Sequence, residues 1–386
     1  MRVLYIGDPG TQGGAALAFL EVVSQMKARG VSVVVCTSIE NEFNAQLDNL
    51  GLENVSIGHE SVLEPISPYK WKRPIKYPIR WLIYRLHLKN ALNNVKHKVD
   101  IKTIDLIHTN SARNDVGCYL NKKYGIPHIM HIREFADADF KCISFRRNYI
   151  SVFNDYTTKF IAISNAVKSH WVKKGIHASN VVQIYDGVEY KNIEKSAAED
   201  KQRTDLHMVM TSGICEPKGQ HLVIEALHLL PAKIREHVFI DFIGWDDPRY
   251  LESLRAKIKE YNIEQYVNFK GAMPRATKVL GDYQIGLMCS KSEGFGRVTA
   301  EYMFAQLGVI ASNSGANPEL IGNGVHGLLF ESGNAKSLAD CIERFYQDRQ
   351  LLVNCSLNAC QKAHEEYTEE KNADNIYKLY LEVLKK

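Results

Sequence analysis

The sequence predicts an α/β protein built from two Rossmann-like domains. With 386 residues, the chain is long enough for two domains that each bury a core of their own. It opens with an apolar strand at residues 3–6, a helical pattern that ends at Gly30, and a second strand at 31–36. This β-α-β order predicts a parallel sheet. A later apolar strand at 208–211, followed by a helix at 220–230, opens the second domain.

The remaining elements follow from apolar runs and helical spacing along the chain. In the first domain we expect strands at 104–108, 126–135, 160–163 and 181–184, and in the second at 238–243, 267–269, 284–289 and 309–311. Helices are expected at 250–261, 297–307, 335–365 and 369–386.

Domain boundaries are predicted from a polar stretch without an apolar period. We place the first domain at 1–190, an interdomain linker at 191–205, the second domain at 206–368 and a C-terminal helix at 369–386.

Composition excludes several classes of protein. Hydrophobic residues make up 45% and charged residues 24%, which is typical of a globular protein and not of a disordered one. The eight cysteines form no C-x2-C pair, so we expect reduced thiols and neither a disulfide framework nor a zinc site. The first strand turns polar at Asp8, too early for a secretion signal, and no later apolar run reaches about 18 residues. A cytoplasmic protein is expected.

The loop after the first strand is rich in glycine but does not match a dinucleotide-binding motif. Its glycines are spaced G-x-x-G-x-x-G-G, and no acidic residue ends the second strand. A nicotinamide enzyme is therefore disfavoured. We expect the amides of Gly13 and Gly14 to face a phosphate or an acceptor, with a plain tight turn as the alternative.

The most informative stretch is Ser290 to Glu301, a glycine-rich turn that follows the apolar strand at 284–289 and leads into the helix at 297–307. Glu293 lies in the turn and Glu301 about two helical turns later, so both carboxylates can point toward the same side. Gly294 and Gly296 allow close backbone approach, and the start of a helix offers N–H groups to an anion. The stretch predicts an anionic, hydroxyl-rich ligand.

A family resemblance rests on this stretch and two motifs after it. The segment S-E-G-F-G-R-V-T-A-E is followed by G-A-N-P-E at 315–319 and G-V-H-G-L-L-F at 324–330. The ordered set resembles the retaining glycosyltransferases of family 4, which have the GT-B fold, two Rossmann-like domains facing a central cleft. In that family the last helix crosses back onto the first domain.

The resemblance implies an enzyme activity. We expect transfer of a hexose or N-acetylhexosamine from a nucleotide-diphosphate sugar, with UDP favoured and GDP next, to a glycan or lipid-linked saccharide. It implies retention of the anomeric configuration and no metal or other cofactor, the nucleotide sugar being a substrate. Synthesis of bacterial surface polysaccharide or lipopolysaccharide is the expected setting.

The resemblance also assigns roles to residues. Glu293 would hold hydroxyls of the donor sugar, Glu301 the ribose, and Lys218 the diphosphate. The loop that contains Met273 would hold the nucleotide base. The predicted catalytic residues are Glu293 and Arg133, and the predicted donor-binding residues are Gly13, Gly14, Lys218, Phe295, Gly296, Arg297, Glu301 and Met273.

The sequence departs from the family pattern at three positions. Gly213 stands where an arginine usually helps to clamp the diphosphate, Arg133 where many members have a histidine, and Asp186 where asparagine is usual. Loss of this arginine should weaken neutralisation of the diphosphate unless Arg297 or Arg133 supplies the charge. These departures leave open a catalytically silent member that binds a nucleotide sugar or serves as a partner subunit.

Residues 65–99 contain no acidic residue, while basic and aromatic residues alternate. Such a stretch is typical of a segment that lies on an anionic membrane surface, and a solvated basic helix is the alternative. No nucleic-acid reader motif accompanies it, so a nucleic-acid partner is disfavoured. We expect a peripheral protein on the inner face of the cytoplasmic membrane. The predicted membrane or acceptor contacts are Lys70, Trp71, Lys72, Arg73, Lys76, Arg80 and Trp81.

Two other chemistries were weighed. The sequence D-A-D at 137–139 matches the D-x-D motif with which a different glycosyltransferase fold holds a divalent metal. Two glutamates also suggest a glycoside hydrolase with acid and base roles. The hydrolase would leave the phosphate-type loops unexplained.

Overall fold

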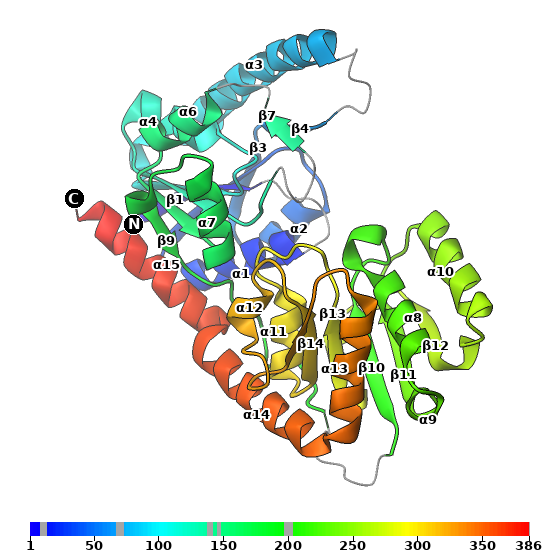
Figure 1. The fold of residues 1–386 in the computed structure, drawn as a ribbon. Coiled ribbons are helices and arrows are strands. Elements are labelled where there is room, and N and C mark those ends of the chain that lie inside the picture. The colour runs from blue at the N-terminus through cyan, green and yellow to red at the C-terminus, as the bar shows by residue number, and fades with distance from the viewer. Residues whose placement is uncertain (8–13, 67–72, 137–141, 145–147, 197–203, 386) are drawn as a thin grey trace. The chain divides into compact units, whose positions relative to one another are not determined.

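The computed structural model describes residues 1–7, 14–66, 73–136, 142–144, 148–196 and 204–385 (Figure 1). Its contacts divide the chain into two compact units. The first contains Met1–Gly187 and Glu369–Lys386, and the second contains Val188–Thr368. Each unit has a parallel sheet with helices, so the predicted α/β class with two domains is confirmed.

The described part of the first unit has a seven-stranded sheet in the order β3-β2-β1-β5-β6-β8-β9, and every neighbouring pair is parallel. The strand order reverses between β1 and β5, which makes a switch point at the carboxyl ends of these strands. The strands are β1 (Arg2–Gly7), β2 (Ser32–Thr37), β3 (Glu53–Ser56), β5 (Leu106–Asn110), β6 (His128–Ile132), β8 (Lys159–Ala162) and β9 (Val181–Gln183), with an antiparallel pair β4 (Leu63–Pro65) and β7 (Cys142–Ser144) beside them.

Helices cover both faces of this sheet. One apolar cluster joins it to Phe19 of α1 and Ile376 of α15, which lie side by side in Figure 1. The cluster on the other face includes Ala91 of α3 and Leu120 of α4. Both faces are thus buried, which explains why the strands read as continuous apolar runs. The helices are α1 (Gly14–Ala28), α2 (Glu42–Asn49), α3 (Arg73–Lys98), α4 (Val116–Tyr124), α6 (Tyr149–Tyr156), α7 (Asn165–Lys173) and α15 (Glu369–Leu384).

The described part of the second unit has a six-stranded parallel sheet in the order β12-β11-β10-β13-β14-β15. Its strands are β10 (Leu206–Thr211), β11 (Val238–Ile243), β12 (Val267–Gly271), β13 (Ile285–Met288), β14 (Gly308–Ser312) and β15 (Leu328–Phe330). Its α-helices are α8 (Gln220–Leu229), α9 (Ala232–Arg235), α10 (Pro248–Glu260), α11 (Arg297–Phe304), α12 (Asn317–Leu320), α13 (Ala335–Gln347) and α14 (Arg349–Glu366).

The helix predicted at 335–365 is two helices, and this prediction was wrong. Asp348 separates α13 from α14 with a non-helical backbone, φ −116° and ψ 83°. Its carboxylate accepts a hydrogen bond from the N–H of Leu351 and so caps α14. An aspartate in this role starts a new helix, because it satisfies an N–H that has no partner within the helix.

The chain passes between the units just before the predicted linker, between Gly187 and Val188, and returns between Thr368 and Glu369. Residues 191–196 belong to the second unit, where the N–H of Ser196 donates to the carbonyl of Ala305 at 2.8 Å. The polar residues predicted an interdomain linker here, but the hydrogen bond of Ser196 attaches this part of the chain to the second unit. The rest, 197–203, lies outside the described residues.

Helix α3 of the first unit is 26 residues long and contains Pro78. Its buried residues, Tyr84, Ala91 and Val95, lie from the middle of the helix toward its C-terminal end. Within the described ranges, no helix, α3 included, is long and apolar enough to cross a membrane.

Candidate functional site

In the second unit, the predicted order of strand, glycine-rich turn and helix is present at the end of β13. Gly296 precedes α11 with φ +90°, a left-handed conformation that favours glycine. Gly296, the N-cap residue, has no side chain that could cap the helix. The start of α11 is the positive end of the helix dipole, a place that suits an anion.

Two predicted donor-site residues come together beside this helix. Lys218, in the loop after β10, lies 2.8 Å from Glu293, measured from Nζ to Oε1. Their side chains are 35% and 16% exposed, so the pair is reachable from solvent. Gly219 makes the approach of the two loops possible, because a Cβ there would lie 2.5 Å from the carbonyl oxygen of Cys289.

The turn that carries Glu293 is held by the G-A-N-P-E motif. The N–H of Ala316 donates to the carbonyl of Glu293 at 2.9 Å. A Cβ on Gly315 would lie 2.3 Å from that same oxygen, and the residue has φ +56°. The motif thus fixes the backbone of Glu293 in position.

Two buried polar atoms near Gly296 were missed by the sequence analysis. Thr299 Oγ1 and Asn317 Oδ1 have no hydrogen-bond partner within the part of the chain that the structure describes. Both residues are fully buried, and a Cβ at Gly296 would lie 3.1 and 3.4 Å from these atoms. Buried polar atoms usually have a partner, so a ligand at the start of α11 would find both within the site. Neither lies at a spacing that the sequence alone would single out.

The other predicted donor residues have varied surroundings. Phe295 is buried, and its ring packs edge-on against Tyr367 with 5.5 Å between the ring centroids. Arg297 and Glu301 are half-buried on α11. Met273 is 37% exposed in the loop after β12. Gly14 opens α1 in the first unit, and Gly13 lies outside the described residues.

A tryptophan covers the position where the family has its second phosphate cation. A Cβ on Gly213 would lie 2.5 Å from the ring of Trp245, which follows β11. Trp245 is 60% exposed. An arginine at position 213 would have to displace this ring, so the glycine and the tryptophan belong together. This contact could not be predicted from the sequence, because the two residues are far apart in the chain.

In the first unit, Arg133 follows β6 and is buried, with 7% of its surface exposed. Its Nη1 lies 2.5 Å from Asp186 Oδ1, and its Nε donates to Asn110 Oδ1 at 2.5 Å. The guanidinium charge is therefore compensated inside the first unit. Sequence reasoning noted Asp186 as a departure from the family pattern but did not pair it with Arg133.

A chain of buried polar side chains continues from Arg133. His131 Nδ1 lies 3.3 Å from His108 Nε2, and His108 Nδ1 is hydrogen-bonded to the hydroxyl of Tyr380 on α15. That hydroxyl lies 2.8 Å from the one of Tyr5. Burial, and secondarily the charge of Arg133, lowers the pKa of both histidines well below the usual value. They are neutral at pH 7, so the 3.9 Å contact between His131 and Asp186 is not an ion pair.

Glu134, next to Arg133, organises the loop after β5. Its Oε1 accepts hydrogen bonds from Ser111 Oγ at 2.8 Å and from the N–H of Ala112 at 3.0 Å. Burial raises the pKa of Glu134, although these hydrogen bonds act in the opposite direction. Ser111 has φ +106°, a strained conformation for a residue with a side chain. The carboxyl ends of β5 and β6 are therefore tied together.

The predicted membrane residues fall mainly on α3, whose cations are partly paired. Lys76 Nζ lies 2.8 Å from Glu64, and Arg80 lies 3.4 Å from Glu64 and 3.6 Å from Glu60. Residues 65–99 contain no carboxylate, but the fold brings two from just before that stretch. Lys76 and Arg80 are therefore partly charge-compensated within the first unit, and their membrane contact stays a prediction. Lys70, Trp71 and Lys72 lie outside the described residues, and Arg73 opens α3.

Helix α3 also presents a row of exposed aliphatic side chains. Ile75, Ile79, Leu82 and Leu86 are 63%, 54%, 56% and 55% exposed. Their spacings of four, three and four residues put them on one face of the helix. Trp81 is 37% exposed beside them. We call these four residues the aliphatic stripe.

Comparison with known families gives two adjoining matches. The model "Glycosyltransferase Family 4" matches residues 12–191, and "Glycosyl transferases group 1" matches residues 192–362. Together they cover most of the chain.

Relatives match at low identity. An uncharacterized glycosyltransferase of Methanocaldococcus jannaschii is 24% identical over 306 residues, 77% of this chain and 81% of the relative. The N-acetyl-alpha-D-glucosaminyl L-malate synthase of Bacillus anthracis is 29% identical over 140 residues, 36% of each chain. The N-acetylgalactosamine-N,N'-diacetylbacillosaminyl-diphospho-undecaprenol 4-alpha-N-acetylgalactosaminyltransferase of Campylobacter jejuni is 26% identical over 170 residues, 44% of this chain and 45% of that protein.

Among solved structures, Anabaena Alr3699/HepE in complex with UDP is similar with a TM-score of 0.81 and 20% identity. The similarity covers 98% of this chain and 99% of that one. At this identity it is a likeness of fold.

Proposed function

Since the chain belongs to the glycosyltransferases of the group 1 and family 4 type, we propose that it is a retaining transferase using a nucleotide-diphosphate sugar. A UDP-sugar is the favoured donor and a GDP-sugar the next. The transferred sugar is a hexose or N-acetylhexosamine. A glycan or lipid-linked saccharide accepts it, in bacterial surface polysaccharide or lipopolysaccharide synthesis.

The observation that carries this proposal is the Lys218–Glu293 pair beside the start of α11, whose N-cap residue is Gly296. A departing nucleoside diphosphate needs a cation and N–H donors, which Lys218 and the first amides of α11 supply. A sugar needs acceptors for its hydroxyl hydrogens, and Glu293 supplies a carboxylate at that place. Thr299 and Asn317 add polar atoms to the same cradle.

The proposed reaction exchanges one bond at the anomeric carbon. The bond between that carbon and the diphosphate oxygen breaks as the acceptor hydroxyl attacks from the same face. The leaving phosphate takes the acceptor's proton, so no protein nucleophile is needed. Lys218 stabilises the charge that develops on the diphosphate, and Glu293 holds the sugar in position. We keep Arg133 as a proposed catalytic contact on the acceptor side.

The acceptor proposal includes a membrane. The aliphatic stripe, with Trp81 beside it and Lys89 nearby on α3, suits a helix lying in the headgroup layer of an anionic bilayer. A peripheral place on the inner face of the cytoplasmic membrane follows. The Campylobacter jejuni relative, whose name includes a diphospho-undecaprenol-linked saccharide, supports an acceptor of that kind.

The decisive experiment is a thermal-shift panel with UDP, GDP, ADP and common UDP- and GDP-sugars, each with and without EDTA. A ligand at about 100 times its dissociation constant adds roughly 2.7 kcal/mol to the free energy of unfolding. We expect stabilisation by one nucleotide class, unchanged by EDTA. Loss of the shift with EDTA would instead favour the metal-dependent alternative, whose Asp137 and Asp139 lie outside the described residues.

A catalytically silent nucleotide-sugar-binding subunit is the second candidate, favoured by Gly213 and by the engagement of Arg133 with Asp186. Turnover of the donor sugar separates the two. We expect Glu293→Gln to lower turnover by about 100-fold or more, as for loss of a group that stabilises the transition state. Glu216→Gln, an exposed carboxylate in the Lys218 loop, serves as the matched control. Equal turnover in the two variants would contradict the role of Glu293.

A further inference from the structure

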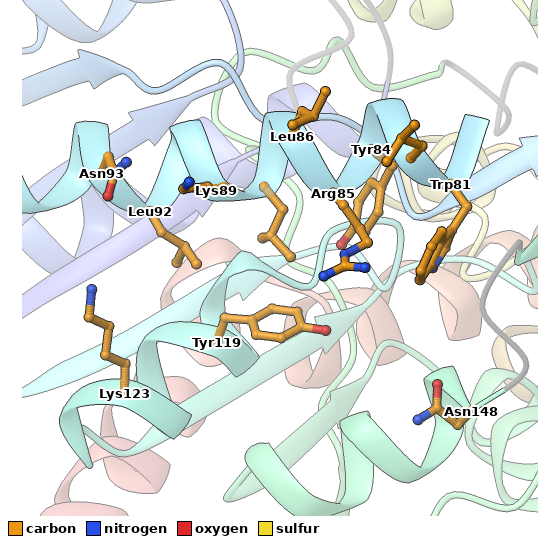
Figure 2. Close-up of a pocket in the computed structure, with 12 residues that line it drawn as sticks. Trp81, Tyr84, Arg85, Leu86, Lys89, Leu92, Asn93, Tyr119, Lys123 and Asn148 are labelled. Atoms are coloured by element: carbon orange, nitrogen blue, oxygen red, sulfur yellow. The ribbon is translucent and has the colours of Figure 1, made fainter. Parts of the chain in front are cut away.

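A large groove lies on the first unit between α3 and α4, close to the start of α6 (Figure 2). Its volume is about 1050 Å³, just above the range of roughly 300–1,000 Å³ for small-molecule pockets. Trp81, Tyr84, Leu88 and Leu92 of α3 line it, with Tyr119 of α4 opposite. The groove is thus wide, aromatic and aliphatic, as a long hydrocarbon requires.

Three cations share the lining of this groove. Arg85 stacks on the ring of Trp81 with 4.7 Å from Cζ to the ring centroid, and Figure 2 shows its guanidinium directed between the two helices. Lys89 stands one helical turn later on α3, and Lys123 lies on α4. The described residues that line the groove include no carboxylate. An apolar chain with a phosphate head matches this combination of surface and charge.

One loop connects the groove to Arg133. Tyr84, in the groove wall, donates a hydrogen bond from its hydroxyl to Asp115 Oδ1. Asp115 ends the loop that starts at Asn110, which accepts a hydrogen bond from Arg133. A ligand in the groove therefore contacts a wall that is fixed to the carboxyl edge of the sheet, where open α/β sheets bind their ligands.

The groove and the aliphatic stripe overlap on α3, because Leu82 and Leu86 of the stripe also line the groove. Figure 2 shows Leu86 pointing away from α4, while Leu92 points toward it. Ile75 and Ile79 of the stripe do not line the groove. These two exposed residues suit a bilayer, whereas the groove lies between two helices.

We propose that this groove binds the isoprenoid chain of a polyprenyl-phosphate lipid, with the phosphate held by Arg85, Lys89 and Lys123. The inference rests on the proposed function, since it names the lipid part of the acceptor. The saccharide would extend from the phosphate toward the loop at 110–115.

The test is equilibrium binding of a fluorescent polyprenyl phosphate to the full chain in a mild non-ionic detergent, followed by fluorescence anisotropy. Undecaprenyl phosphate, undecaprenol, phosphatidylglycerol and inorganic phosphate serve as competitors. We expect undecaprenyl phosphate to compete best and inorganic phosphate not to compete. Leu88→Glu, which puts a carboxylate in the groove, should weaken binding about 10-fold or more, since an unpaired charge there must be desolvated. Ile79→Glu, the same change on the stripe, should leave it unchanged.

A second variant tests the groove in case Leu88→Glu fails to fold. Lys89 and Lys123 are exposed, so the double change Lys89→Glu, Lys123→Glu removes the cations without touching the core. It should weaken binding of undecaprenyl phosphate and leave undecaprenol unaffected. The UDP thermal shift of each variant verifies the second unit.

Several outcomes would overturn the proposal. Equal competition by phosphatidylglycerol would indicate general lipid docking, and equal binding by wild type and both variants would remove the groove from recognition. A dimer that Leu88→Glu dissociates would make the groove an interface between copies. If UDP still stabilises the protein in the thermal-shift assay, any of these results refutes only the proposal that the groove binds the lipid. If no nucleotide stabilises the protein, the proposed function itself is refuted.

Discussion

Arg133 and Asp186 form a buried ion pair at two positions where this chain departs from its family together. The resemblance places a histidine at position 133 and an asparagine at 186, both neutral when buried. Here the two changes introduce opposite charges 2.5 Å apart, with side chains that are 3% and 6% exposed. A buried charge without a partner is costly, so either change alone would be unfavourable. The departures are best understood as one coupled substitution.

Asp186→Asn tests this coupling. It leaves the Arg133 guanidinium buried without its counter-charge and should lower the free energy of unfolding by about 3 kcal/mol. The double variant Arg133→His, Asp186→Asn should recover much of that loss. Urea unfolding gives both values. Asp374→Asn, in the partly exposed pair with Arg29, should have a much smaller effect. A double variant no more stable than Asp186→Asn would show that the two positions are independent.

Three buried histidines predict acid sensitivity of the first unit. Burial lowers the pKa of His128 from 6.5 to about 4, and those of His108 and His131 well below 6.5. The unfolded chain therefore binds more protons, and stability should be complete above about pH 6.5 and fall below it. Each histidine contributes about 1.4 kcal/mol per pH unit in that window. Burial raises the pKa of Glu134, so this group changes the pH dependence of stability in the opposite direction. It is one group, whereas the histidines are three.

Urea midpoints between pH 7.5 and 4.5 measure this effect. His128→Gln should flatten the dependence, because the group that gains a proton on unfolding is gone. His97→Gln, at the exposed end of α3, is the control and should not change the slope. A flat profile for the wild-type chain would contradict the neutral buried histidines.

The sequence predicted those site residues that act through local motifs. Lys218 and Glu293 follow strands of one parallel sheet, so their approach could be expected from the order of elements. Trp245 over Gly213 and the partners of Arg133 could not be predicted, since they depend on how loops far apart in the chain pack. The charge of a side chain is known from the sequence. Whether a residue far along the chain neutralises that charge is known only from the structure.

The side chains of helix α3 have different surroundings. Ala91 and Val95 are packed in the core, Leu88 lines the groove and also packs against that core, and the aliphatic stripe is exposed and shares part of the groove. The basic and aromatic composition was evident from the sequence. The pairing of Lys76 with Glu64 was not evident from the sequence, because Glu64 lies before the stretch that lacks acidic residues.

This pairing predicts unequal effects of two lysines on membrane binding. Lys89→Gln should reduce flotation with anionic vesicles by about fivefold in partition coefficient, as for one basic residue worth about 1 kcal/mol near such a surface. Lys76→Gln should have a smaller effect, because Glu64 already compensates its charge at 2.8 Å. Neutral vesicles are the control for both. A larger loss with Lys76→Gln would mean that the Glu64 pair opens at the membrane.

At the scale of the whole molecule, the last helix of the chain completes the core of the first unit. The chain leaves this unit after Gly187, builds the second unit and returns at Glu369. Ala373, Ile376, Tyr380 and Val383 of α15 are then buried in the cluster that includes Tyr5. The return of this helix was expected from the resemblance, not from its composition. Its alternating polar and apolar residues would suit any amphipathic helix.

Ile376→Asp tests whether the first unit depends on residues that follow the second. Ile376 is fully buried, so a carboxylate there should destabilise the first unit by several kcal/mol. Hydrogen exchange should then show loss of protection in β1 and β5, while β10 and β13 stay protected and UDP still stabilises the second unit. Leu381→Asp, on the same helix but 36% exposed, should leave both units protected. Simultaneous loss of protection in all four strands would show instead that the two units unfold as one, because their stabilities are coupled through the chain crossings at 187–188 and 368–369.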